Sequence, residues 1–302
     1  MSYIMTTTNL TKTYGKKDAA KDVSIHVREG EIYGLIGRNG AGKTTVMRMI
    51  SGLSKPTSGS YQLNGENKFG VGVLIESPGI YPNMSAAENL RLKCIAMGCY
   101  SKKYVDDLLL TVGLENAGKK NAGSFSLGMR QRLGIALALV GDPKMIVLDE
   151  PINGLDPQGI VEVRHTLEKL KEEKNITIMI SSHILDELSK LADSYGIIHE
   201  GKLLDEFTTE ELSSRCGQFI IIKTTDNRKA VALINKMDEL TNGEVIASTD
   251  DDGNVRVVDV LDKTIEINKA LMENNIGVKE IFIQRTSLED YYLSVTGGDH
   301  NG

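Results

Sequence analysis

The chain has 302 residues, 40% of them hydrophobic and 25% charged, which is typical of a globular protein and excludes disordered and collagen-like classes. Its 35 basic and 41 acidic residues give a net charge of −6, and without a block of Lys or Arg this balance argues against nucleic-acid binding. The longest apolar stretches, such as Gly134–Gly141, are far shorter than the roughly 20 residues of a membrane-spanning helix. The N-terminal segment lacks the pattern of a secretory signal. We therefore expect a cytoplasmic protein.

Short β-rich runs alternate with helical patterns over the first two thirds of the chain, which predicts an α/β layered fold. Strands are expected at residues 31–36, 71–76, 145–149, 177–181 and 195–199. Helices are expected at residues 43–51, 85–97, 102–112, 127–140, 158–174 and 184–192. Because the helices between residues 85 and 140 follow one another without a strand, we expect a helical subdomain at about residues 77–140.

The composition and pattern change after about residue 215. Four strands are expected there at residues 219–223, 244–248, 255–260 and 281–284, two helices at 228–237 and 264–274, and a last helix capped by Ser287. The order β-α-β-β-α-β predicts a small ferredoxin-like α+β domain. No catalytic residue types cluster in this region, so we interpret it either as a regulatory or interaction module or as a stabilising appendage.

A phosphate-binding pattern, GxxxxGK[ST], lies between the strand expected at 31–36 and the helix expected at 43–51. Glycines let the backbone N–H groups and the helix N-terminus approach a polyphosphate. In this pattern the Lys43 ammonium bridges the β- and γ-phosphates, and the Thr44 hydroxyl binds Mg²⁺. The alternative is a glycine-rich turn that only caps a helix. The predicted nucleotide-binding residues of this loop are Gly37, Arg38, Asn39, Gly40, Ala41, Gly42, Lys43, Thr44 and Thr45.

The apolar strand expected at 145–149 ends in two carboxylates, Asp149 and Glu150. An apolar run of this kind is typical of a parallel sheet, and the carboxyl ends of its strands form the ligand crevice. Downstream of a phosphate loop, Asp149 is predicted to hold Mg²⁺, and Glu150 to accept a proton from an attacking water. In isolation, an acidic strand end of this kind is usually structural.

The phosphate loop and the acidic strand end alone allow a kinase, a GTPase or an ATPase. Two further segments help to distinguish between these classes. Ser126 and Gly128 lie at the start of the helix expected at 127–140, whose N–H groups can face an anion, although Ser126 can equally be a simple helix cap. His183 follows the strand expected at 177–181 and is predicted to reach the γ-phosphate from the same sheet edge as Glu150, although a lone His after a strand is usually structural.

The set GRNGAGKT, SLGMRQ, VLDEP, NGLDP and SSH, in this order, resembles the ATP-binding cassette (ABC) family. The resemblance implies a P-loop NTPase cassette at residues 4–215 with a helical subdomain, followed by an accessory domain at residues 216–302. The C-terminal region, which contains SLEDYYLSVTGG, resembles a bacterial subgroup associated with resistance or immunity to bacitracin and lantibiotic peptides.

The resemblance also implies that two cassettes enclose ATP and Mg²⁺ between the phosphate loop of one chain and the Ser126–Gln131 segment of the other. Tyr14 is then expected to stack on adenine, and the loop that ends in Asp156 is expected to link the two sites. The alternatives are an exposed aromatic at a strand end and a turn before a helix.

Three positions depart from the family pattern. Leu127 replaces the first glycine and Met129 replaces the Gln of the usual LSGGQ, so a close backbone approach to phosphate is expected only at Ser126 and Gly128. Glu76 stands where most cassettes carry Gln, a replacement common in the lantibiotic-immunity subgroup. A carboxylate only accepts hydrogen bonds, and we predict that it binds Mg²⁺ or the attacking water and tunes the coupling of transport to hydrolysis. The alternative is a tolerated replacement without consequence. The basic segment Gly118–Ser124 lacks the acidic residue often found there in exporters.

We therefore predict the ATP-hydrolysing subunit of a bacterial ABC transporter that powers export by separate membrane permeases, at the inner face of the membrane. The partner cassette is expected to be a second copy of the chain. The subgroup resemblance points to antimicrobial peptides as cargo, with another drug, a lipid or an unknown substrate as the alternative. The first rival class is a soluble cassette acting in translation or DNA repair, which typically carries two cassettes or a long coiled-coil insertion, whereas this chain has one phosphate loop and no sustained heptads. The second is a small-molecule kinase, which would leave SLGMRQ, NGLDP and His183 unexplained.

Overall fold

The computed structural model describes residues 2–64, 70–215, 218–237, 246–250, 252–258, 260–285 and 287–297. The chain divides into two compact units, one formed by Met1–Thr209 with Val295–Gly302 and the other by Glu210–Ser294. Each unit has its own hydrophobic core. No helix among the described residues is long and apolar enough to cross a membrane.

The first unit is built on a six-stranded sheet in the order β10-β9-β4-β8-β7-β6, in which only the edge strand β10 runs antiparallel to its neighbour. The five strands expected from the sequence in this region are confirmed, although β6 is shorter than expected. The strands of this sheet are β4 (Ile32–Ile36), β6 (Gly72–Leu74), β7 (Met145–Asp149), β8 (Thr177–Ser182), β9 (Ser194–His199) and β10 (Lys202–Thr208).

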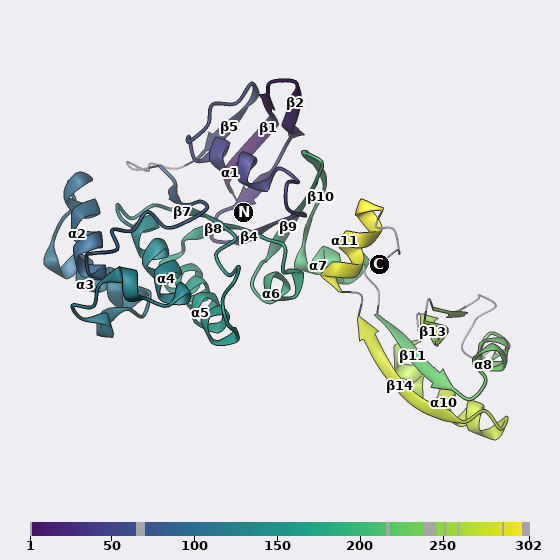
Figure 1. The fold of residues 1–302 in the computed structure, drawn as a ribbon. Coiled ribbons are helices and arrows are strands. Elements are labelled where there is room, and N and C mark those ends of the chain that lie inside the picture. Colours follow the sequence, from purple (N-terminus) through teal and green to yellow (C-terminus); the bar gives the residue numbers. More distant parts are fainter. Residues whose placement is uncertain are drawn as a thin grey trace. The chain divides into compact units, whose positions relative to one another are not determined.

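A second, antiparallel sheet is present that the sequence reading missed. It contains β1 (Tyr3–Tyr14), β2 (Lys17–Val23), β3 (His26–Arg28) and β5 (Ser58–Leu63). Helix α1 (Lys43–Ile50) lies between the two sheets, and its buried side chains Val46, Met47 and Met49 share one core with residues of both (Figure 1). The expected α/β layering is therefore correct but incomplete.

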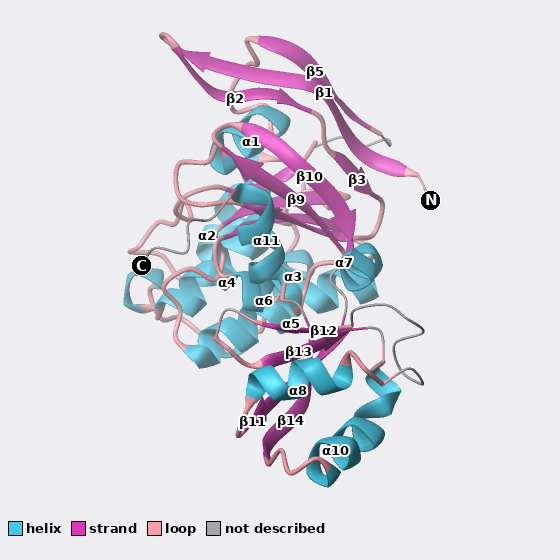
Figure 2. Ribbon diagram, turned by 90° about the vertical axis from the view of Figure 1, so that its right-hand side faces the viewer, coloured by secondary structure: helices cyan, strands magenta, loops and turns pink. Residues whose placement is uncertain are grey.

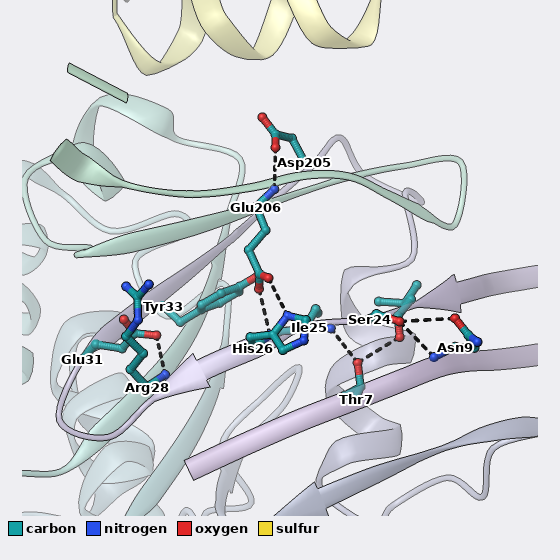
Figure 3. Close-up of polar contacts among 11 residues, drawn as sticks. Thr7, Asn9, Ser24, Ile25, His26, Arg28, Glu31, Tyr33, Asp205 and Glu206 are labelled. Atoms are coloured by element: carbon teal, nitrogen blue, oxygen red, sulfur yellow. Dashed lines mark hydrogen bonds and ion pairs between the residues drawn. The ribbon is translucent and has the colours of Figure 1, made fainter. Parts of the chain in front are cut away.

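A polar joint around Glu206 connects the two sheets (Figure 3). The carboxylate of Glu206, on β10, accepts hydrogen bonds from the Tyr33 hydroxyl of β4 and from the backbone N–H of His26 in β3, both at 2.8 Å. The His26 ring Nδ1 is also 2.8 Å from the second carboxylate oxygen. Burial, with the adjacent Glu206 charge, raises the pKa of the Tyr33 hydroxyl far above its usual value, so this hydroxyl remains a donor.

The helices expected in the first unit are confirmed within a few residues, except that α6 is clearly shorter than the helix expected at 184–192. Figure 2 shows α4, α5 and α6 on the face of the parallel sheet opposite α1. No strand interrupts the described chain between α2 and α4, as expected for a helical subdomain. The helices are α2 (Ala86–Ala96), α3 (Lys102–Thr111), α4 (Leu127–Ala138), α5 (Pro157–Lys174) and α6 (Leu185–Ser189). A further helix, α7 (Thr209–Arg215), was not expected and lies almost entirely in the second unit.

The second unit has an antiparallel sheet in the order β12-β13-β11-β14, with α8 and α10 packed on one face. Its expected elements are found, but residues 244 and 245 of the strand expected at 244–248, and residue 259 of the strand expected at 255–260, lie outside the described residues. The elements are β11 (Gln218–Thr224), α8 (Asn227–Ile234), β12 (Ala247–Thr249), β13 (Val255–Val258), α10 (Thr264–Glu273), β14 (Val278–Arg285) and the last helix α11 (Leu288–Thr296).

Candidate active site

The loop between β4 and α1 carries the phosphate-binding pattern. β4 is fully buried, and the helix that follows begins at Lys43 with Gly42 as its N-cap. Gly42 has a φ of 111°, and a Cβ there would lie 2.5 Å from the Ala19 carbonyl oxygen, so the position requires glycine. Because no side chain caps this helix, its first N–H groups are available to an anion.

Lys43 is 5% exposed, so its ammonium group needs partners within the protein. It donates a hydrogen bond of 2.6 Å to the Gly37 carbonyl oxygen and lies 3.2 Å from Oε1 of Glu150. The phosphate loop and the end of β7 are thereby joined through one buried charge.

Thr44 and Asp149 meet next to this pair. The Thr44 hydroxyl donates to Asp149 Oδ2 at 2.7 Å, and the other carboxylate oxygen accepts a hydrogen bond of 2.5 Å from the Ser181 hydroxyl. Since β8 lies between β4 and β7, the ends of these three strands bring the groups together.

Glu150 begins the turn after β7 and has a φ of 49°, a strained value for a residue with a side chain. Its N–H donates to the Ser181 hydroxyl at 2.9 Å, and its Oε2 lies 2.8 Å from Nδ1 of His183. Ser181 therefore holds both acidic residues, a role the sequence reading did not assign. The feature that could have identified Ser181 is the register of β7 and β8, in which Ser181 is the strand partner of Asp149.

A cavity of about 570 Å³ opens over the phosphate loop, which is within the usual range for a small-molecule site. Its walls include residues that the sequence reading missed: Lys17, Asp18 and Ala19 of β2 on one side, and the turn at Glu200 and Gly201 on another. The Gly201 N–H donates to the Ala41 carbonyl oxygen at 2.8 Å, so this turn supports the loop directly. The full lining is Lys17, Asp18, Ala19, Arg38, Asn39, Gly40, Ala41, Gly42, Lys43, Thr44, Thr45, Glu150, Glu200 and Gly201.

Eight of the predicted residues do not line this cavity. Gly37, Asp149 and His183 are bonded to residues that do line it, and the other five are Tyr14, Glu76, Ser126, Gly128 and Asp156. The half-exposed Tyr14 is the strand partner of Lys17, which does line it. The carboxylate of Glu76 pairs instead with Arg48 of α1.

The remaining three predicted residues gather at the starts of α4 and α5. Ser126 caps α4 by accepting from the Met129 N–H at 3.2 Å, and Asp156 caps α5 by accepting from the Gly159 N–H at 3.0 Å. A Cβ on Gly128 would lie 3.5 Å from Cα of Gly159, so the two helix starts are in contact. Leu127 is 39% exposed at this place.

The chain is similar in sequence to known proteins. The sequence model of the ABC transporter family matches residues 20–153. The chain is 45% identical to the bacitracin transport ATP-binding protein BcrA of Bacillus licheniformis, over 99% of both chains. It is 46% identical to the lantibiotic transport ATP-binding protein SrtF of Streptococcus pyogenes, over 66% of this chain and 88% of that protein.

A solved structure shares the fold over about two thirds of the chain. The dimeric bacterial ABC transporter cassette MJ0796 superposes with a TM-score of 0.60 at 25% identity, covering 68% of this chain and 98% of that one. With relatives of this similarity along nearly its whole length, the chain belongs to the ATP-binding proteins of the ABC transporter family.

Proposed function

We propose that this ATPase subunit powers export through separate permease subunits, held at the inner face of the cell membrane by those partners. The observation that carries the proposal is the hydrogen-bonded cluster that joins Lys43, Thr44, Asp149, Glu150 and His183 beneath one cavity. A cluster of this composition is suited to hydrolysis of a nucleotide rather than to its storage, because a carboxylate is placed beside the phosphate-binding lysine.

The residues of the cluster have distinct proposed roles. Lys43 and the loop N–H groups bind the β- and γ-phosphates, Glu150 accepts a proton from the attacking water, and His183 orients Glu150 and contacts the γ-phosphate. The paired oxygens of Thr44 and Asp149 fit Mg²⁺, which is commonly held by one or two carboxylates together with substrate phosphates. Bound there, the ion would neutralise the charge that develops on the phosphates.

A second cassette supplies the other half of the site in this proposal. Ser126 and Gly128 lie outside the cavity of their own chain, so they contact nucleotide only when another chain presents them. The Asp156 cap adjoins them and would relay changes between the two sites, while Tyr14 would stack on adenine beside Lys17. The dimeric cassette structure supports this arrangement, with a second copy of the chain as the partner.

The membrane partner is proposed to dock on the helical subdomain, which we place at about residues 77–140 of a cassette domain spanning 4–215. A groove of about 500 Å³ there is lined by apolar side chains, among them Pro78, Tyr81 and Leu92. Tyr81 is 56% exposed, as an anchor for a partner helix would be.

The names of the similar proteins support bacitracin- or lantibiotic-type peptides as the cargo of the transporter, with another drug or a lipid as the alternative. The strand order β12-β13-β11-β14 supports a ferredoxin-like fold for the accessory domain proposed at residues 216–302. None of the described residues of that domain lines the cavity, and the domain is proposed to regulate or stabilise the subunit.

Co-purification from native membranes tests the proposed partner. The tagged chain, extracted in mild detergent, is expected to retain an integral membrane protein, and Tyr81→Asp is expected to reduce its recovery roughly tenfold by placing a charge in the apolar groove. Tyr61→Asp, on the exposed strand β5, is the matched control. A chain that co-purifies with ribosomes or DNA, or that phosphorylates small molecules, would contradict the proposal.

Glu76 is proposed to couple the membrane partner to hydrolysis. It precedes the groove-lining residues Ser77 and Pro78, and its pair with Arg48 connects that segment to α1, the helix of the phosphate loop. Glu76→Gln is expected to change the ratio of transported cargo to hydrolysed ATP by up to about fivefold, since an exposed ion pair contributes up to about 1 kcal/mol. The measurement is transport and ATPase rate in vesicles, with the exposed Glu172→Gln as the control; unchanged rates of both would refute the role.

A further inference from the structure

Two cysteines outside the nucleotide cavity lie at the C-terminal end of α2. Cys94 is in the last turn of the helix and is completely buried. Cys99 lies in the connection to α3 and is partly exposed. Both are free thiols, and none of the proposed nucleotide chemistry uses them.

The backbone at this helix end brings the two residues face to face. Gly98 has a φ of 68°, its N–H donates to the Ile95 carbonyl oxygen at 3.1 Å, and the Cys99 N–H donates to the Cys94 carbonyl oxygen at 2.9 Å. These two hydrogen bonds after a left-handed glycine define a Schellman motif. In that motif the residues at the positions of Cys94 and Cys99 are the pair whose side chains make contact across the helix end, where an apolar pair is usual.

The environment gives the two thiols different reactivity. Burial raises the pKa of the Cys94 thiol to about 11, and the neighbouring Cys99 thiol contributes to that rise. Cys94 is thus protonated at neutral pH and shielded from solvent, while Cys99 is the thiol that a reagent in solution can reach.

We propose that Cys94 and Cys99 form a reversible dithiol–disulfide modification site, whose oxidant is a low-molecular-mass disulfide. The Cys99 thiolate attacks one sulfur of the reagent, forms a mixed disulfide and releases the first reagent thiolate. Cys94 then gives up its proton and attacks the Cys99 sulfur, which forms the internal bond and releases the second thiolate. Two protein thiols are oxidised and one reagent disulfide is reduced to two thiols.

The position of the site gives the modification a structural consequence. Leu92, Lys93 and Ala96, on the same turns of α2, line the apolar groove of the helical subdomain. An internal disulfide would link the end of this helix covalently to the connection between α2 and α3. Oxidation of the two thiols would therefore restrict the movement of one wall of the groove.

The test uses the full chain carrying Cys216→Ser, incubated with glutathione disulfide at mildly alkaline pH. The expected product has no titratable thiol and a mass lower by two hydrogen atoms, without bound glutathione. Cleavage after Met97 separates Cys94 from Cys99 in the sequence, so the two fragments are expected to stay together until a reductant is added. Fragments that separate without reductant would overturn the proposal.

Two variants of the same chain distinguish the steps. Cys94→Ala is expected to stop at the mixed disulfide, with one glutathione on Cys99, because the second thiol is missing. Cys99→Ser is expected to keep Cys94 unmodified over the same time, because the buried thiol cannot reach the reagent. Stable accumulation of the glutathione adduct in the chain that keeps both cysteines would show that the internal bond does not form, and would also overturn the proposal.

Discussion

Glu150→Gln is expected to lower the rate of ATP hydrolysis by about 10²–10⁴-fold, the usual contribution of a general base, while ATP still binds. The amide has the shape of the carboxylate but cannot take a proton from water. Glu150 makes its close contacts with Lys43 and His183 through its side-chain oxygens, and one of these remains an oxygen in the variant. The measurement is phosphate release at saturating Mg-ATP.

The same variant is expected to retain two chains as a dimer, because unhydrolysed ATP would remain between the cassettes. Size-exclusion chromatography with light scattering compares the variant with the wild type, each with and without Mg-ATP. A dimer seen only in the variant with ATP is the expected result. An ATPase rate within a few-fold of the wild type would show that Glu150 is not the base. A slow variant that stays monomeric would mean that the permease or the Leu127 departure controls closure.

Lys43→Ala is expected to weaken ATP binding by roughly 10- to 150-fold, because a hydrogen bond to a charged group contributes about 1.5–3 kcal/mol. The substitution also removes the cation beside Glu150, so the carboxylate would repel the phosphates more strongly. Isothermal titration with a non-hydrolysable ATP analogue measures the effect directly.

Two controls define that experiment. Lys102→Ala removes an exposed lysine at the start of α3 and is expected to leave the affinity unchanged. A melting curve for each variant shows whether the fold is intact, since Lys43 is buried and bonded to Gly37. Affinity within twofold of the wild type, in a folded Lys43→Ala chain, would remove this lysine from the proposed phosphate site.

The buried strands could be predicted from the sequence, whereas the antiparallel sheet could not. Every residue of β7 and β8 is buried, and both strands carry an apolar run, because both of their faces are covered. β5 has the sequence SGSYQL with almost every residue exposed, so it carries no alternation of apolar and polar side chains. Its position comes from pairing with β1, a long-range contact that local patterns do not encode.

The candidate site likewise contains residues that could be predicted from the sequence and residues that could not. Lys43, Thr44, Asp149, Glu150 and His183 follow strand ends, and parallel strands place their ends at one edge, so their proximity could be predicted. Lys17 and Gly201 could not be found, because they reach the cavity from the other sheet and from a turn without a motif. Ser126 was indicated by its place at a helix start and Asp156 by resemblance alone, and the proposed ligand contacts of both require a second chain.

The joint at Glu206 has a consequence for how this protein tolerates change. One wall of the proposed nucleotide cavity belongs to β2 in the antiparallel sheet, and its floor belongs to the loop after β4 in the parallel sheet. The distance between wall and floor therefore depends on the contacts that hold the two sheets together. Glu206, with Tyr33 and His26, makes such contacts. A substitution at one of these three residues is therefore expected to change the affinity for nucleotide, although none of them lines the cavity. A related protein with a different residue there would need compensating changes in the cavity as well as in the fold.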